Sequence, residues 1–117
     1  MAIYTKLFLS GSSLNTPQIL ISSATSASAV QLHTNTSGSI DEVYLYAYND
    51  STSSMVLSVL WGSGATEPKD VVRTTVAPQG GRSLVVDGKL LQNGSTISAY
   101  ATIANWVTVD GFVNRIT

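Results

Sequence analysis

The chain has 117 residues, six of them basic and seven acidic, so its net charge at pH 7 is −1. This length suits one domain with a sizeable core, and the scattered charges lack the basic stripe that nucleic-acid binding needs. No run of about 18 apolar residues could span a bilayer, and the absence of cysteine excludes disulfides and thiolate sites.

Hydroxyl groups supply most of the polarity of this chain. Apolar residues make up 44% of it, but only 11% are charged, whereas roughly a quarter is usual. The sequence contains 17 Ser and 13 Thr, whose hydroxyl groups supply the polarity that charged residues supply in most proteins. Ordinary hydrophobicity with low net charge predicts a folded domain and not a disordered chain.

The N-terminal part is expected to belong to the same domain as the rest of the chain. We treat residues 1–117 as one domain in which residues 1–15 form an N-terminal arm or an extra strand. The start has one Lys and a short apolar run, too little for a signal peptide, so we expect the protein to remain unsecreted. Residues 22–32 are rich in Ala, but Ser and Thr compete for backbone hydrogen bonds, which favours a loop leading into a strand. His33, at that strand's end, is expected to be exposed or half-buried.

A strict alternation of side chains begins at residue 40. In IDEVYLYAYN, aliphatic residues occupy one face of the predicted strand and tyrosines the other. The tyrosines are Tyr44, Tyr46 and Tyr48, and the aliphatic residues between them are Val43, Leu45 and Ala47. Only one face of a sheet meets the core of a two-layer sandwich. We therefore expect the aliphatic set to face the core and the tyrosines to contact another chain. The alternative is that the tyrosines half-line the core, with their hydroxyls at its rim.

The remaining runs predict further strands. They are SMVLSVLW, DVVRTTVAP, RSLVVDG, STISAYATI and WVTVDGFVNRI. Turn signals lie at Asn49-Asp50-Ser51, Gly62-Ser63-Gly64, Pro78-Gln79-Gly80-Gly81, Asp87-Gly88 and Asn93-Gly94. About seven or eight short strands with such turns predict an all-β fold, a single antiparallel β-sandwich of jelly-roll-like or immunoglobulin-like type.

The last predicted strand also has two distinct faces. Val107, Val109 and Val113 share the face that we expect to be central in the sandwich. Trp106, Phe112 and Ile116 share the opposite face, where we expect Phe112 and Ile116 to contact a neighbouring chain. Gly111 lies between, and a glycine in a strand marks a bulge or a close backbone approach.

Groups that could converge into a catalytic or metal site are sparse. His33 is the only histidine, and apart from the abundance of serines nothing supports a Ser-His-Asp triad. Asp41 and Glu42 are adjacent, so they face opposite sides of a strand and cannot form a glycosidase pair. We place Asp41 at the end of a turn and Glu42 on a solvated face. The sequence therefore predicts no enzymatic activity, no catalytic residue, no metal and no cofactor.

Trp61 and Trp106 support an alternative from another class. One closes a predicted strand before a glycine-rich loop, and the other opens the last strand. Carbohydrate-binding β-sandwich modules stack sugars on exposed aromatic rings of this kind. We favour burial of both rings at strand ends over this alternative.

Several runs resemble small virion proteins of tailed bacteriophages, especially the β-sandwich proteins that decorate or cement heads or form the base of head fibres. The runs are IDEVYLYAYND, a strand ending in WG, VAPQGG, and LLQNGSTISAYATIANWVTVDGFVNRI, within residues 40–117. The resemblance implies a non-enzymatic capsid decoration or cement protein in the virion. Its partners would be the major capsid protein and copies of itself, with a trimer favoured. A neck, tail or fibre-base protein is the alternative. A weakly charged, hydroxyl-rich surface suits many copies packed together, because large like-charge fields repel.

Overall fold

The computed structural model describes residues 3–12 and 16–117, which form two packed antiparallel sheets. The strands are β1 (Tyr4–Phe8), β2 (Ile19–Leu20), β3 (Val30–Thr34), β4 (Ile40–Asn49), β5 (Met55–Trp61), β6 (Val71–Val76), β7 (Ser83–Leu91), β8 (Thr96–Ala101) and β9 (Val107–Ile116). One short 3-10 turn, η1 (Ser26–Ser28), lies in the loop expected before β3. Within these described ranges, no helix has the length and apolar character to cross a bilayer.

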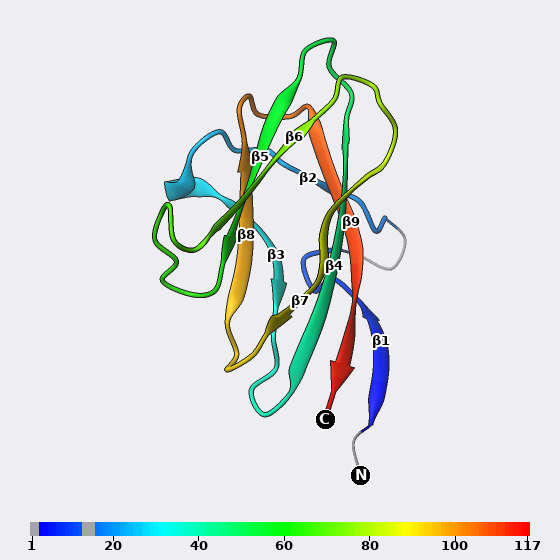
Figure 1. Ribbon diagram of the computed structural model, residues 1–117, viewed down its shortest axis with the longest axis vertical. Helices are drawn as coiled ribbons and strands as arrows, with labels where there is room; N and C mark the ends of the chain where they lie inside the picture. Colours follow the sequence, from blue (N-terminus) through cyan, green and yellow to red (C-terminus); the bar gives the residue numbers. More distant parts are fainter. Residues whose placement is uncertain (1–2, 13–15) are drawn as a thin grey trace.

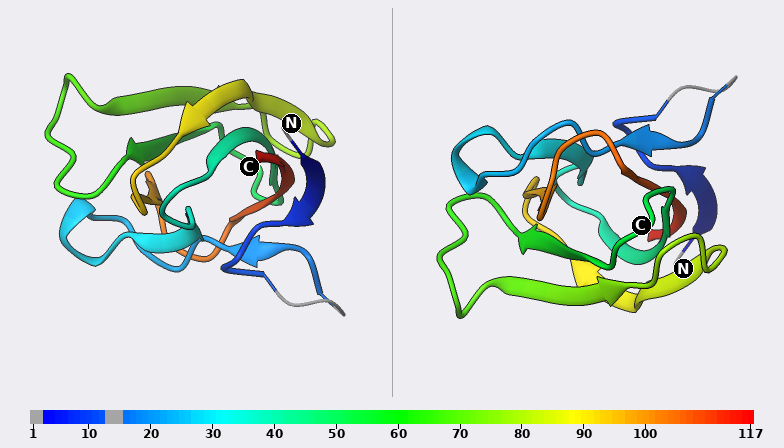
Figure 2. Two further views of the ribbon diagram at one scale, coloured as in Figure 1. Left: turned by 90° about the horizontal axis from the view of Figure 1, so that it is seen from below. Right: turned by 90° about the horizontal axis from the view of Figure 1, so that it is seen from above.

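Two sheets face each other across the core. Sheet A has the strand order β1-β9-β4-β7, and β2 also pairs with β9; sheet B has the order β3-β8-β5-β6 (Figure 1). Figure 2, which looks along the long axis, shows the strands arranged around a common interior. The predicted antiparallel β-sandwich is confirmed. The extra N-terminal strand that the sequence allowed is β1. The two-residue strand β2 was not predicted, because no alternating pattern marks it.

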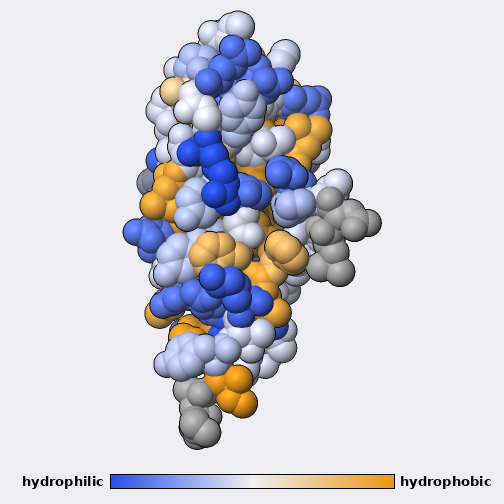
Figure 3. Space-filling view, turned by 90° about the vertical axis from the view of Figure 1, so that its right-hand side faces the viewer, coloured by the Kyte–Doolittle hydropathy of each residue, from blue (hydrophilic) through white to orange (hydrophobic). Residues whose placement is uncertain are grey.

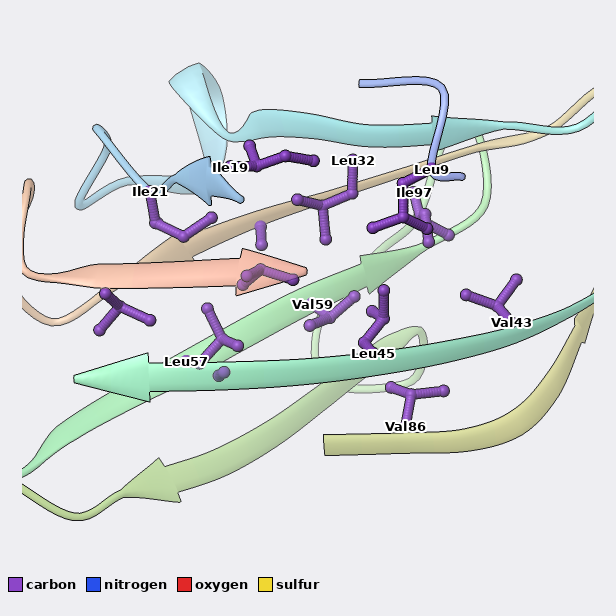
Figure 4. Close-up of a cluster of buried hydrophobic side chains, with 14 of the residues drawn as sticks. Leu9, Ile19, Ile21, Leu32, Val43, Leu45, Leu57, Val59, Val86 and Ile97 are labelled. Atoms are coloured by element: carbon purple, nitrogen blue, oxygen red, sulfur yellow. The ribbon is translucent and has the colours of Figure 1, made fainter. Parts of the chain in front are cut away.

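Inward-facing aliphatic side chains of both sheets fill the interior (Figure 4). Those of β4 and β9 are Val43, Leu45, Ala47, Val107, Val109 and Val113, all at most 1% exposed. They pack against residues of sheet B such as Leu57, Val59 and Ile97. The predicted inward faces of both strands are therefore confirmed, because aliphatic side chains leave water there.

Gly111 marks a close approach between two backbones. It lies opposite Leu45, at the inward position between Val109 and Val113. A Cβ atom at Gly111 would lie 2.0 Å from the carbonyl oxygen of Tyr44. The pairing of β4 with β9 runs through this point without a register shift. Of the two reasons predicted for a glycine here, close approach is the one observed.

One predicted turn is wrong. Asp87-Gly88 lies inside β7, where the register against β4 shifts between Val43 and Tyr44. Gly88 has a φ of 78°, which glycine adopts readily because it has no Cβ atom. The same residue pair serves a tight turn or a β-bulge, and the local sequence does not distinguish the two.

Candidate functional site

The outer face of sheet A carries all the residues that the sequence suggested as protein contacts. Strand partners in register point to the same side of a sheet. Outward residues therefore form cross-strand rows, which are Tyr4–Ile116–Ile40, Phe8–Phe112–Tyr44 and Asp110–Tyr46–Leu84. The three tyrosines of β4 are half-buried, while the residues between them are fully buried. The predicted outward direction of the tyrosines is thus confirmed.

Exposed apolar surface is concentrated on this outer face. Ten large hydrophobic residues are exposed among those described, and six of them point outward from sheet A. The six are Tyr4, Phe8, Leu20, Ile40, Leu84 and Leu90. Figure 3, which views the side where β1 lies, shows hydrophobic patches interspersed with hydrophilic ones. The outer face of sheet B has only Val56 in this group.

Stacking holds the aromatic row in place. The rings of Tyr44 and Phe112 are 4.8 Å apart between centroids and inclined by 16°, and the Lys6 ammonium lies 4.6 Å from the Phe112 centroid. Such contacts favour one arrangement of the rings. The Glu42 carboxylate, 3.4 Å from the Tyr44 hydroxyl, is the main reason why the pKa of that phenol is raised. Two residues predicted as contacts, Tyr44 and Phe112, therefore touch each other.

An arginine covers the ring of Tyr46. The Arg82 guanidinium carbon lies 3.8 Å from the ring centroid. Arg82 Nε donates one forked hydrogen bond to the Asp110 carboxylate, 3.0 Å from Oδ1 and 3.1 Å from Oδ2, which keeps the planar cation over the ring. Sequence reasoning missed Lys6 and Arg82, since both are distant in sequence from the tyrosines. Asp110 could have been found, because it lies two residues before Phe112 on the same strand face.

The remaining predicted contact residues lie at the two ends of this face. Ile116 is half-buried in the row with Tyr4 and Ile40. Tyr48 lies towards the other end of β4, where its hydroxyl donates to Asp50 Oδ1 at 3.2 Å. The face therefore runs along most of β4, a length of about 25 Å at the usual rise per residue.

A buried polar cluster joins the two sheets and differs from expectation. Asp41 is fully buried and accepts hydrogen bonds from Arg115 Nε at 2.8 Å and Arg115 Nη2 at 3.0 Å. His33, on β3 of sheet B, is 1% exposed and lies 2.7 Å from Asp41. The expected exposed or half-buried position of His33 is therefore wrong, and Asp41, expected at the end of a turn, is the second residue of β4 and is fully buried. Polar side chains can be buried when each finds a partner, and here they do.

The hydrogen bonds of His33 define its tautomer. The backbone N–H of Ser10 donates to Nδ1 at 3.0 Å. Nδ1 is therefore an acceptor, and the imidazole proton lies on Nε2 and points at Asp41. Both ring nitrogens are engaged, and neither has a serine hydroxyl as partner. Burial raises the pKa of Asp41, but the hydrogen bonds from Arg115 and His33 outweigh it and lower that pKa from 3.8 to about 2.

The other candidate ligand groups are separated in space. Within residues 3–12 and 16–117, no cluster of three or more His, Asp or Glu could hold a metal ion. Trp61 ends β5, is half-buried and donates from Nε1 to the carbonyl of Leu90 at 3.0 Å. Trp106 is 44% exposed and lies near Met55, at the start of β5, so its expected burial is wrong. The two tryptophans therefore cannot line one sugar site.

Comparison of the chain with protein-family models, with curated proteins and with solved structures found no match.

Proposed function

We propose that this protein is a non-enzymatic structural component of a tailed-phage virion, and that the outer face of sheet A contacts neighbouring chains. The concentration of exposed apolar residues on that one face carries the proposal. Large exposed apolar patches on a folded domain mark interaction surfaces. The resemblance of residues 40–117 supports the phage context, with capsid decoration or cement as the proposed role and the neck, tail or fibre base as the alternative.

The proposed mechanism is stabilisation by mass action. A protein that binds the assembled lattice of the major capsid protein, but not its free subunit, stabilises the lattice. Rings already held by stacking and by Arg82 lose little freedom on binding. The face also carries charges of both signs, Lys6 and Arg82 with Glu42 and Asp110, which can orient a partner.

Self-association is the first expected result. Light scattering on the purified chain at micromolar concentration should give a mass well above 12.3 kDa, with three copies favoured. Burial of the exposed rows of sheet A between copies supplies the driving force. A mass of one chain at every concentration would contradict self-association and leave only contacts with the lattice.

Tyr46→Ser tests the contact face directly. Truncating a central interface aromatic often costs about 2 kcal/mol or more, which is roughly thirtyfold in affinity. We expect the variant to associate with itself or with purified particles more weakly by about that factor, with its unfolding midpoint nearly unchanged. Co-sedimentation with particles and light scattering are the measurements.

Tyr100→Ser is the matched control. Tyr100 is half-buried on the outer face of sheet B, opposite Ser58, and hydrogen-bonds to Glu67. The control variant should associate as the unmodified chain does. Equal losses in both variants, or unfolding of Tyr46→Ser alone, would show that the face is wrongly assigned.

A further inference from the structure

We infer that a groove around Trp106 binds a saccharide ring, a function separate from the contacts of the outer face of sheet A. The groove has a volume of about 430 Å³, within the range of about 300–1,000 Å³ that is usual for small-ligand sites. Three loops meet there, the ones between β4 and β5, β6 and β7, and β8 and β9 (Figure 1). Its main lining residues are Asp50, Thr52, Gln79, Ile103 and Trp106.

Trp106 and Ile103 form an apolar surface in this groove. Trp106 is 44% exposed and Ile103 is 52% exposed. A pyranose ring presents C–H bonds on one face and hydroxyls around its edge. It can therefore stack on the indole while its hydroxyls remain available to polar neighbours.

Polar groups suited to hydroxyls surround that surface. Asp50 is exposed and accepts one hydrogen bond from Tyr48 at 3.2 Å. A carboxylate offers about four acceptor positions, so Asp50 can also accept from a pair of sugar hydroxyls. The Gln79 side chain and the Thr52 hydroxyl add donors and acceptors on the same groove. This combination of an apolar surface with a few placed polar groups is typical of ligand sites.

Asn49 holds the groove in shape. It is fully buried, and its Nδ2 donates to the carbonyls of Ser53 at 2.8 Å and Val76 at 3.0 Å. Its Oδ1 accepts from the Ser51 amide at 2.9 Å. Backbone hydrogen bonds join the other two loops to the loop between β4 and β5. The Gln79 N–H donates to the Asn49 carbonyl, and the Asp50 N–H donates to the Trp106 carbonyl. A preorganised site loses less conformational entropy when a ligand binds.

Backbone strain is also located at this groove. Gln79 and Asn105 have φ values of 47° and 73°, in the left-handed region that non-glycine residues seldom adopt. Gln79 lines the groove, and Asn105 immediately precedes Trp106. Such conformations persist where surrounding contacts enforce them, and they cluster at functional sites. The backbone N–H of Asn105 donates a hydrogen bond to the carbonyl oxygen of Ile21 at 2.9 Å.

The chemistry of the lining favours a neutral saccharide over an anion. The groove contains one carboxylate, hydroxyls and an amide, but neither Lys nor Arg. A phosphate or an acidic polymer would meet the Asp50 charge without a compensating cation. Neutral hexoses and N-acetylhexosamines match the acceptor, donor and stacking groups present.

A glycan array of neutral hexose and N-acetylhexosamine oligosaccharides, probed with the full chain, is the test. Saturable binding to at least one glycan is expected, followed by titration with that glycan in solution. Trp106→Ala and Asp50→Asn should each lower the affinity at least tenfold. Trp61→Ala is the matched control and should bind normally.

The unfolding midpoint of each variant keeps the outcomes separate. If Trp106→Ala does not fold, Trp106→Phe and Asp50→Asn decide in its place. No saturable binding on the array, or binding that survives the groove substitutions, would overturn the inference. Tyr46→Ser should retain glycan binding, so failure of the contact face and failure of the groove can be distinguished.

Discussion

Removal of residues 112–117 is expected to abolish folding. β9 is an interior strand of sheet A, placed between β1 and β4. The register of β1 with β9 runs from Phe8 opposite Phe112 to Tyr4 opposite Ile116, so truncation removes every partner residue of β1. The same cut removes Val113, which is fully buried, and Arg115, the ionic partner of Asp41.

The expected loss is comparable with the whole stability of the domain. Full burial of a large apolar side chain contributes about 1.5–3 kcal/mol, and the cut removes one fully buried and two half-buried apolar side chains, Val113, Phe112 and Ile116. Small domains are stable by only about 5–15 kcal/mol. Circular dichroism and denaturant titration should therefore show an unfolded or aggregated product.

Deletion of Thr117 alone is the control for this truncation. Thr117 exchanges two backbone hydrogen bonds with Ile3 at the exposed end of the sheet, at 2.9 and 3.0 Å. Its removal should leave the unfolding midpoint almost unchanged. A soluble chain ending at Gly111 with the midpoint of the full protein would contradict the structural role of the last strand.

The parts of the fold that alternate strictly were predictable from the sequence. In β4 and β9, aliphatic and aromatic or polar residues take turns, so hydrophobic burial determines which side faces inward. The same reasoning predicted the outward tyrosines and Phe112. Contact of those residues with another chain stays a prediction.

Features that depend on long-range register were not predictable. Asp41 meets Arg115 and His33 because β4 pairs with β9 and packs against β3, and no local pattern specifies that meeting. The sequence places Asp41 only at the end of a turn, and its burial depends on partners that are distant in the chain. The bulge at Gly88 had a turn signature, and the Trp106 groove forms only where three loops converge.

Arg115→Ala is expected to destabilise the protein by about 3 kcal/mol at pH 7. Removing one partner of a buried ion pair leaves an uncompensated charge, which typically costs about 3–5 kcal/mol. Asp41 is fully buried, but the Arg115 side chain is 18% exposed, so the lower end applies. Arg82→Ala is the matched control. Its partner Asp110 lies at the surface, and exposed pairs contribute about 0–1 kcal/mol.

The effect of Arg115→Ala should shrink in acid, and the pKa of Asp41 gives the pH window. That pKa is lowered from 3.8 to about 2 in the folded protein. A lowered carboxyl pKa stabilises the fold above the unfolded value of 3.8, and this stabilisation is lost as the pH falls towards about 2. The shift corresponds to about 2 kcal/mol. Arg115 is the largest cause that lowers this pKa, so the variant keeps less of the stabilisation that ionised Asp41 provides.

Denaturant titrations of the unmodified chain, Arg115→Ala and Arg82→Ala between pH 7 and pH 2.5 would measure this dependence. The difference between the first two should be largest at neutral pH and should narrow below pH 3.8. Asp41→Asn in the Arg115→Ala background should recover part of the loss at pH 7, because it removes the unpaired charge. A difference that is constant across this range, or equal effects of the two arginine substitutions, would mean that Arg115 stabilises the fold by packing its methylene groups and not by compensating Asp41.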